Sequence, residues 1–223
     1  MKWDYYHQQI RKIKEKGQID FMEIRYLGKI IKLRLIDDSD DTVQLLTDWR
    51  NKTRHMFATN FELNHEKTKK WINTDVLENP DRIQFMIFVD DKKIGIIGSD
   101  LNEAKTEVEF DNLMKDPDFN LPGLMTVVAK VYHRWNFDFL KIEKMYGQLF
   151  SDNFKILNLH MRCGWKMINV VPLKRVYAKD GWKWETMELK SENDYGERYM
   201  TVIELTKENL MKNFDEIDYE IMQ

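Results

Sequence analysis

A strand, an irregular loop and a long amphipathic helix follow one another in the middle of this chain and limit its fold more than any other segment. Residues 106–113 alternate acidic with apolar side chains, with Glu107 and Glu109 on one side, which predicts a strand. A loop with Gly123 follows, and an apolar stripe then predicts a helix over 124–139. Such a helix start offers unpaired N–H groups and the positive end of a dipole, which suits a phosphate or pyrophosphate.

The segments on either side predict the order β-α-α-β-β-β-α-β-α-β-β. Helices interspersed in a mostly antiparallel run of strands predict an α/β (α+β) fold with one central sheet in one domain. A tip at residues 90–93 predicts a four-residue hairpin loop. The other predicted strands are 30–36, 84–89, 94–98, 144–150, 175–178, 182–189 and 199–205. The other predicted helices are 42–54, 65–77 and 153–163, with a short terminal helix that begins near Lys207.

The two ends differ from the middle in composition. Residues 1–29 are charge-dense and helical up to Gly17, and we interpret them as an N-terminal helical arm, mainly solvated, with a packing or dimer role as the alternative. Residues 30–212 form the predicted domain and 213–223 a C-terminal tail. The polar loop 191–198 has no predicted function, and the oligomeric state stays open between a monomer and a homodimer.

Composition excludes several classes of function. The 223 residues carry 35 basic and 38 acidic side chains, so no basic surplus indicates a nucleic-acid partner. Cys163 is the single cysteine, which excludes an internal disulfide and a thiolate metal cluster and favours the cytoplasm. The N-terminus lacks the apolar core of a signal peptide, and no apolar run approaches a membrane span. No ATP-binding, dinucleotide-binding, zinc-protease or serine-hydrolase motif occurs, so we expect no metal.

Residues 153–165 resemble a known family. At this place the GNAT superfamily of acyl-CoA-dependent N-acyltransferases carries Asn-x-x-Ala-Ile-x-Leu-Tyr-x-x-x-Gly-Phe. The chain matches this pattern at Asn153, Leu159, Gly164 and, conservatively, Trp165, with identical spacing. His160 stands at the position of the family's tyrosine.

The loop before the long helix resembles the same family's pyrophosphate loop, Gln/Arg-x-x-Gly-x-Gly/Ala, over residues 120–125. Asn120 replaces the family's Gln or Arg, Met125 replaces a small residue, and Pro122 removes one backbone N–H from the cradle. The resemblance covers residues 30–205. Weaker similarities at Leu33-Arg34, Trp49-Arg50-Asn51 with Arg54, and Val176 to Gly181 favour the subgroup that acetylates ribosomal proteins and amino sugars.

The resemblance implies acetyl-CoA, or another short acyl-CoA, as co-substrate. The backbone around Asn112, Leu113 and Met114 would bind the thioester carbonyl. The pyrophosphate would lie against the loop, and the contacts implied there are Asn120, Gly123, Leu124 and Met125. Asn153 would bind the pantetheine arm, although its place at a predicted helix start also explains it as an N-cap.

The implied reaction is direct attack of an amine on the thioester, which needs a base, donors for the oxyanion and a proton for the leaving thiolate. His160 is the candidate proton donor, because a histidine can donate a proton as tyrosine does and titrates nearer pH 7. The alternative is a partly buried helix histidine that contacts CoA or the core without proton transfer. Glu107 or Glu109 is the candidate base, with exposed strand carboxylates as the alternative. Cys163 lies three residues after His160, so contact is possible, but direct transfer needs no covalent cysteine.

The acceptor is expected to be a nucleotide-linked amino sugar. Arg and Lys beside aromatic residues suit an anionic, ring-bearing molecule, and the residues concerned are Trp49, Arg50, Arg54, Arg175, Tyr177 and Trp184. The alternative for each of them is a core aromatic or a solvated charge. A ribosomal protein or peptide N-terminus is the same-fold alternative. A non-catalytic binding module is the other, because the loop departs from the family pattern. The acyl group stays open.

Overall fold

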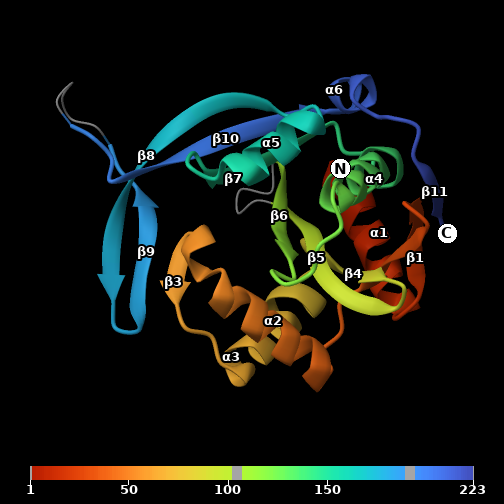
Figure 1. The fold of residues 1–223 in the computed structure, drawn as a ribbon, viewed down its shortest axis with the longest axis horizontal. Coiled ribbons are helices and arrows are strands. Elements are labelled where there is room, and N and C mark those ends of the chain that lie inside the picture. The colour runs from red at the N-terminus through yellow and green to blue at the C-terminus, as the bar shows by residue number, and fades with distance from the viewer. Residues whose placement is uncertain (1, 102–106, 189–193, 223) are drawn as a thin grey trace.

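The computed structural model describes residues 2–101, 107–188 and 194–222 (Figure 1). Its strands are β1 (Asp20–Tyr26), β2 (Lys29–Leu35), β3 (Thr59–Phe61), β4 (Arg82–Val89), β5 (Lys92–Leu101), β6 (Val108–Lys115), β7 (Lys144–Phe150), β8 (Lys166–Ala178), β9 (Gly181–Thr186), β10 (Arg198–Thr206) and β11 (Asp218–Ile221). The helices are α1 (Lys2–Lys16), α2 (Asp40–Lys52), α3 (His65–Lys70), α4 (Leu124–Phe139), α5 (Phe154–Arg162) and α6 (Lys207–Lys212), with a 3₁₀ turn η1 (Arg54–Met56) and a π-helical segment η2 (Trp71–Leu77).

The strands form one eleven-stranded sheet in the order β11-β1-β2-β4-β5-β6-β7-β10-β8-β9-β3. Every neighbouring pair is antiparallel except β6 and β7, which are parallel. The predicted α/β (α+β) class, with one mostly antiparallel mixed sheet flanked by helices, is confirmed. In the described part of the chain, no helix has the length and apolar character needed to cross a membrane.

Two apolar cores cover the two faces of the sheet. On β4, Phe85 and Ile87 point to one face and Met86 and Phe88 to the other, as the two-residue period of a strand requires. The larger core lies under α1 and α4, and the smaller one lies under α2 and η2. The helices between the first strands are therefore separated by the sheet from the long helix that follows β6.

The β4–β5 hairpin is tighter than predicted. Its tip is a two-residue turn at Asp90 and Asp91, whose φ angles are 46° and 64°. Two consecutive positive φ angles are typical of the type I′ turn, whose twist matches that of the flanking strands. Lys92 and Lys93, predicted in the loop, pair instead with Val89 and Phe88.

The expectation of a solvated N-terminal arm is wrong. Tyr6, Ile10 and Ile13 of α1 are buried in the larger core. β1 was not predicted; it pairs with β2 and with the C-terminal β11, so residues from both ends complete the sheet. The apolar stripe on α1 is hidden in the sequence because lysines and arginines surround it.

Some predicted segments extend beyond the described residues. Residue 106, the first of the predicted strand 106–113, lies outside them, and so do residue 189 and residues 191–193 of the polar loop. β6 extends past the predicted end of its strand, and β8 begins well before the predicted 175.

The last third of the chain bends round to meet the helices that follow β2. β8 and β9 form a long hairpin, and β9 pairs with β3, a three-residue strand that was not predicted. Figure 1 shows this hairpin reaching β3 on the left, opposite β6. The sheet thereby encloses a space between its central strands and α2.

β6 and β7 run side by side for only a short distance. They pair at Val108 with Met145 and at Glu109 with Tyr146, and no later pair exists between them among the described residues. β6 also has a bulge against β5, where Asn112 and Leu113 oppose one residue and Asn112 has a φ of 51°. A bulge bends its strand, so the end of β6 diverges from β7.

If α1 belongs to the core, truncating its buried face will destabilise the whole domain. We expect Ile10→Ala to lower the free energy of unfolding by about 2–5 kcal/mol, because it leaves a cavity in the core. Ile10 is 0% exposed, whereas Ile19 beyond the same helix is 39% exposed and provides the matched control. Urea unfolding of Ile10→Ala, Ile19→Ala and the wild type measures this, and equal midpoints for all three would contradict it.

Candidate active site

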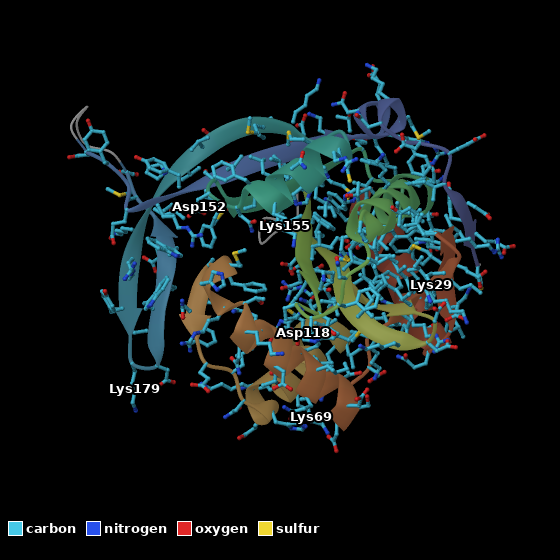
Figure 2. All side chains as sticks on the ribbon, in the orientation of Figure 1. Lys29, Lys69, Asp118, Asp152, Lys155 and Lys179 are labelled. Atoms are coloured by element: carbon cyan, nitrogen blue, oxygen red, sulfur yellow. The ribbon has the colours of Figure 1, made fainter. Side chains whose placement is uncertain are left out.

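A cavity of about 910 Å³ lies in the space that the sheet encloses. One wall comes from α2, β3 and α3, and the other from β6, β7 and α5. Figure 2 shows Lys155, which lines the cavity, beside α5 at the edge of the opening between these two walls. The volume is within the range of small-molecule sites.

The cavity brings together part of the predicted site. The predicted residues that line it are Asn112, Leu113, Met114, Met125, Asn153, His160, Glu109 and Arg50. The predicted residues that do not line it are Glu107, Asn120, Gly123, Leu124, Trp49, Arg54, Arg175, Tyr177 and Trp184. Trp49 is 3% exposed within the smaller core, and Tyr177 is 74% exposed on the β8–β9 hairpin.

The start of α4 has the geometry of an anion site. Gly123 is the N-cap residue, with a φ of 78°. Its carbonyl oxygen accepts hydrogen bonds from the N–H groups of Thr126 and Val127, and the Leu124 N–H donates to Leu121 O at 3.2 Å. Within the described residues, the N–H groups of Gly123 and Met125 have no acceptor. These two donors fit the pyrophosphate of CoA despite the proline in the loop.

Two lysines that sequence reasoning missed lie beside this loop. Lys115 at the end of β6 donates to the carbonyl oxygens of Asp116, at 2.9 Å, and Phe119. Burial lowers the pKa of Lys115, and the nearby charge of Lys155 lowers it further. Both side chains line the cavity. They supply positive charge that Asn120 does not.

Lys155 carries a signal that the sequence does contain. It occupies the second position of α5, where the positive end of the helix dipole disfavours a cation. Asn153, the N-cap of the same helix, accepts a hydrogen bond from the Ile156 N–H at 3.4 Å. A lysine in that first turn is therefore explained better by an anionic ligand than by helix stability.

His160 is buried in an aromatic wall of the cavity. It is 4% exposed, and its ring lies edge-on to Phe110 at 5.5 Å and to Trp165 at 5.4 Å. Burial lowers the pKa of His160 to about 4. The pKa of His160 therefore lies further from pH 7 than that of an ordinary histidine. The imidazole is neutral at pH 7 and keeps one N–H that can donate.

A second histidine, His133 on α4, supports the same wall. It is fully buried, and its Nε2 accepts a hydrogen bond from Trp165 Nε1 at 3.2 Å. Because Nε2 is the acceptor, the neutral ring carries its proton on Nδ1. Burial lowers the pKa of His133 well below its ordinary value. Trp165 is an aromatic residue at the place of the phenylalanine in the family pattern. It thus helps hold the side chains around His160 in position.

Glu109 is the carboxylate best suited to accept a proton. Burial raises the pKa of Glu109 to about 7, and the negative charges of Asp111 and Asp100 add to the rise. The positive charge of Arg82 opposes this rise in the pKa of Glu109. The Nη2 atom of Arg82 lies 2.7 Å from an oxygen of Asp100 and 3.2 Å from one of Asp111. Among the described residues, no three His, Cys, Asp or Glu side chains are arranged to hold a metal ion.

Cys163 does not have the properties of a nucleophile. Its side chain is fully buried, with its sulfur 3.8 Å from the carbonyl oxygen of Thr126. Burial raises the pKa of Cys163 to about 12. Because the thiolate is the reactive form, this geometry favours direct transfer.

Arg50 is the predicted acceptor residue that faces the cavity. Its Nη2 donates to the carbonyl oxygen of Thr59 at 2.8 Å, and its guanidinium carbon lies 3.7 Å from the ring centre of Phe57. Its Nη1 is buried and has no hydrogen-bond partner among the described residues. Burial lowers the pKa of Arg50 to about 10, so it is charged at pH 7.

The predicted acceptor residues of the β8–β9 hairpin form a separate cluster. The guanidinium of Arg175 lies over Trp182 at 4.6 Å and over Trp184 at 5.2 Å. Arg198 lies over Phe150 at 3.4 Å, and Phe150 lines the cavity. Trp184 packs edge-on against Phe150 with ring centres 6.3 Å apart, so the cluster contacts a residue of the cavity wall.

A family model described as an acetyltransferase (GNAT) domain matches residues 31–166, more than half of the chain. The chain belongs to the GNAT acetyltransferase family. It is therefore a CoA-dependent N-acyltransferase by family, and the resemblance seen in the sequence is confirmed.

Solved structures agree on the GNAT fold. Spermidine N-acetyltransferase from Vibrio cholerae, in complex with CoA and spermine, has a TM-score of 0.61 at 13% identity, over 81% of this chain and 98% of that one. An uncharacterized protein from Bacillus halodurans has a TM-score of 0.62 at 12% identity, over 88% and 95%. FdhC, a nucleotide-linked sugar GNAT, has 0.59 at 15%, over 88% and 94%. No curated protein matches the sequence significantly.

The raised pKa of Glu109 has a consequence for stability. Because the folded protein holds this proton more tightly than the unfolded chain, its stability falls as pH rises from the ordinary value of 4.5 to about 7. We expect Glu109→Gln to abolish this loss, so that the variant gains stability over the wild type across this range.

Urea unfolding of both proteins between pH 4.5 and 8 measures the effect. Glu185→Gln is the matched control, since Lys183 lowers the pKa of Glu185 and its removal brings no such gain. A constant difference between Glu109→Gln and wild type across this range would contradict the raised pKa.

Proposed function

We propose that this GNAT enzyme transfers an acyl group to the primary amine of a small acceptor bound in the cavity, by direct attack with Glu109 as general base. Acyl-CoA supplies the activated thioester carbonyl. The observation that carries the proposal is that one cavity joins Glu109, Met125 of the first turn of α4 and Arg50 of the opposite wall. Co-substrate and acceptor would meet at β6.

Glu109 suits this role because an amine acceptor is protonated at neutral pH and must lose a proton before it attacks. A base works best with a pKa near the working pH, and that of Glu109 is about 7. Glu107, the other candidate base, lies outside the cavity wall.

The end of β6 would bind the thioester. Past Glu109, the edge of β6 that faces β7 has no strand partner in the described chain. Its backbone groups are therefore free to pair with the pantetheine arm, beside Asn112, Leu113 and Met114. On α5, which belongs to the same wall as β6, neutral His160 would donate its N–H to the leaving sulfur.

The charge distribution favours a nucleotide-linked amino sugar as acceptor. Carboxylates of Glu109 and Asp111 lie on the β6 wall, whereas Arg50 and Lys67 lie on the other wall beside aromatic rings. An ammonium group would face the acids, and a diphosphate would face Arg50 and Lys67, with the base or sugar against an aromatic ring. The fold similarity to FdhC, a nucleotide-linked sugar GNAT, agrees with this proposal.

A polyamine is the second candidate. The acids at Glu109 and Asp111 suit a cation, and the Vibrio cholerae structure is that of a spermidine N-acetyltransferase with spermine bound. A polyamine has no anionic group for Arg50, which ranks it second. A peptide N-terminus is the third candidate, and it likewise supplies no diphosphate for Arg50 and Lys67.

Calorimetric titration with acetyl-CoA and free CoA tests the first step. Micromolar binding of both is expected, and no binding at millimolar ligand would contradict the proposal and favour a non-catalytic module. Thiol release from acetyl-CoA with amino-sugar nucleotides, spermidine and peptides then ranks the acceptors.

The base assignment is tested by Glu109→Gln. Its kcat should fall about 100- to 10,000-fold, the usual contribution of a general base, while the Kd for acetyl-CoA is unchanged. In the wild type, kcat/KM should rise with pH to a plateau above about 7, since Glu109 must be ionised. Glu107→Gln is the rival variant, and a loss confined to Glu107→Gln would make Glu107 the base.

The acceptor assignment is tested by Arg50→Gln. If Arg50 binds a phosphate, KM for an amino-sugar nucleotide should rise about ten- to a hundred-fold, the effect of losing a charged hydrogen bond, while KM for acetyl-CoA is unchanged. Lys52→Gln, on the same helix but 55% exposed outside the cavity, is the control. If the nucleotide is no substrate and spermidine turns over equally in both variants, the acceptor is the polyamine.

A further inference from the structure

The β1–β2 hairpin brings a tyrosine to the loop before α4. Its turn is formed by Leu27 and Gly28, both with positive φ, and Tyr26 is the last residue of β1. The Tyr26 hydroxyl donates a hydrogen bond to the carbonyl oxygen of Pro122 at 2.9 Å. Tyr26 lies outside residues 31–166, the part that matches the family, so the family pattern does not assign it a function.

This hydrogen bond fixes the orientation of one peptide group. Pro122 C=O and Gly123 N–H belong to the same planar trans peptide, in which they point in opposite directions. With the oxygen held toward Tyr26, the Gly123 N–H points away from β1. It is one of the two N–H groups at the start of α4 that have no acceptor in the described structure.

The contact is close enough that only glycine fits beside the phenol. A Cβ atom at position 123 would lie 2.4 Å from the Tyr26 hydroxyl oxygen, and the φ of 78° already favours glycine. The hydrogen bond also polarises the peptide, which makes its N–H a stronger donor. Proline at 122 leaves Gly123 as the first donor of the loop.

We propose that Tyr26 is a positioning residue of the CoA site, which aims the Gly123 N–H at the pyrophosphate through its hydrogen bond to Pro122. The inference rests on the proposed function, in which the α4 loop binds CoA. Tyr26 itself touches neither substrate.

The test compares Tyr26→Phe with a matched variant. Tyr5→Phe removes the same kind of bond at the other end of α4, where the Tyr5 hydroxyl donates to Phe139 O at 3.1 Å. Calorimetry with acetyl-CoA should give Tyr26→Phe a Kd about three- to ten-fold above wild type, the effect of one neutral hydrogen bond. Tyr5→Phe should bind like wild type.

Two further measurements separate positioning from a general structural effect. With 3′-dephospho-CoA, which keeps the pyrophosphate, Tyr26→Phe should show the same fold loss as with acetyl-CoA. The amide resonance of Gly123 should shift on CoA addition in the wild type, and it should shift less in Tyr26→Phe.

Several outcomes overturn the inference. Equal Kd values for Tyr26→Phe and wild type, or an equal loss in Tyr5→Phe, would do so. A loss that disappears with 3′-dephospho-CoA would place the effect at the 3′-phosphate instead. If wild type itself does not bind acetyl-CoA, the proposed function fails and this inference with it, a result distinct from the other three.

Discussion

The divergence of β6 from β7 is the constraint on which the rest of the site depends. The two strands are parallel neighbours at Val108 and Glu109 and then separate. The bulge at Asn112 and Leu113 turns the end of β6, and α4 starts from the loop that follows. A fully paired sheet would satisfy these backbone groups internally and leave no space between β6 and α5. The separation of β6 from β7 therefore creates both the cavity and the unpaired edge of β6.

Enclosure then determines the chemistry of the side chains in the cavity. Because β9 pairs with β3, the wall opposite β6 is held by backbone hydrogen bonds across the sheet. The burial that results shifts three groups in the directions that desolvation dictates: it raises the pKa of Glu109 and lowers those of His160 and Arg50. Each shift favours the less charged form. The pKa of Glu109 is moved close to neutral pH, whereas Arg50 stays charged and His160 stays neutral at pH 7.

The sequence was sufficient for the fold class and for segments of β6, α4 and α5 that line the cavity, because these segments have clear periodicity and the motif at Asn153 has fixed spacing. It was insufficient for features that depend on contacts between distant parts of the chain. β3 has three residues, too few for a period, and exists because β9 lies beside it. Trp49, an aromatic residue beside Arg50, was predicted as an acceptor contact. It is a core residue instead, because the side of α2 that carries it faces the sheet. The pKa of His160 is lowered by burial against side chains that include Phe110, which is distant in sequence.

The two walls of the cavity come from different parts of the fold. The proposed base and the proposed acceptor contacts therefore lie on different elements. Glu109 and the α4 loop belong to one continuous segment, anchored in the sheet and in the larger core. Arg50 and Lys67 belong to α2 and α3, which rest on the smaller core. Under the proposed function, a change of acceptor would require new side chains on α2, α3 or β3 and would leave the geometry of β6 and α4 intact. The side chains that we propose bind the acceptor, Arg50 and Lys67, are therefore carried by helices other than the strand that carries the proposed base, Glu109.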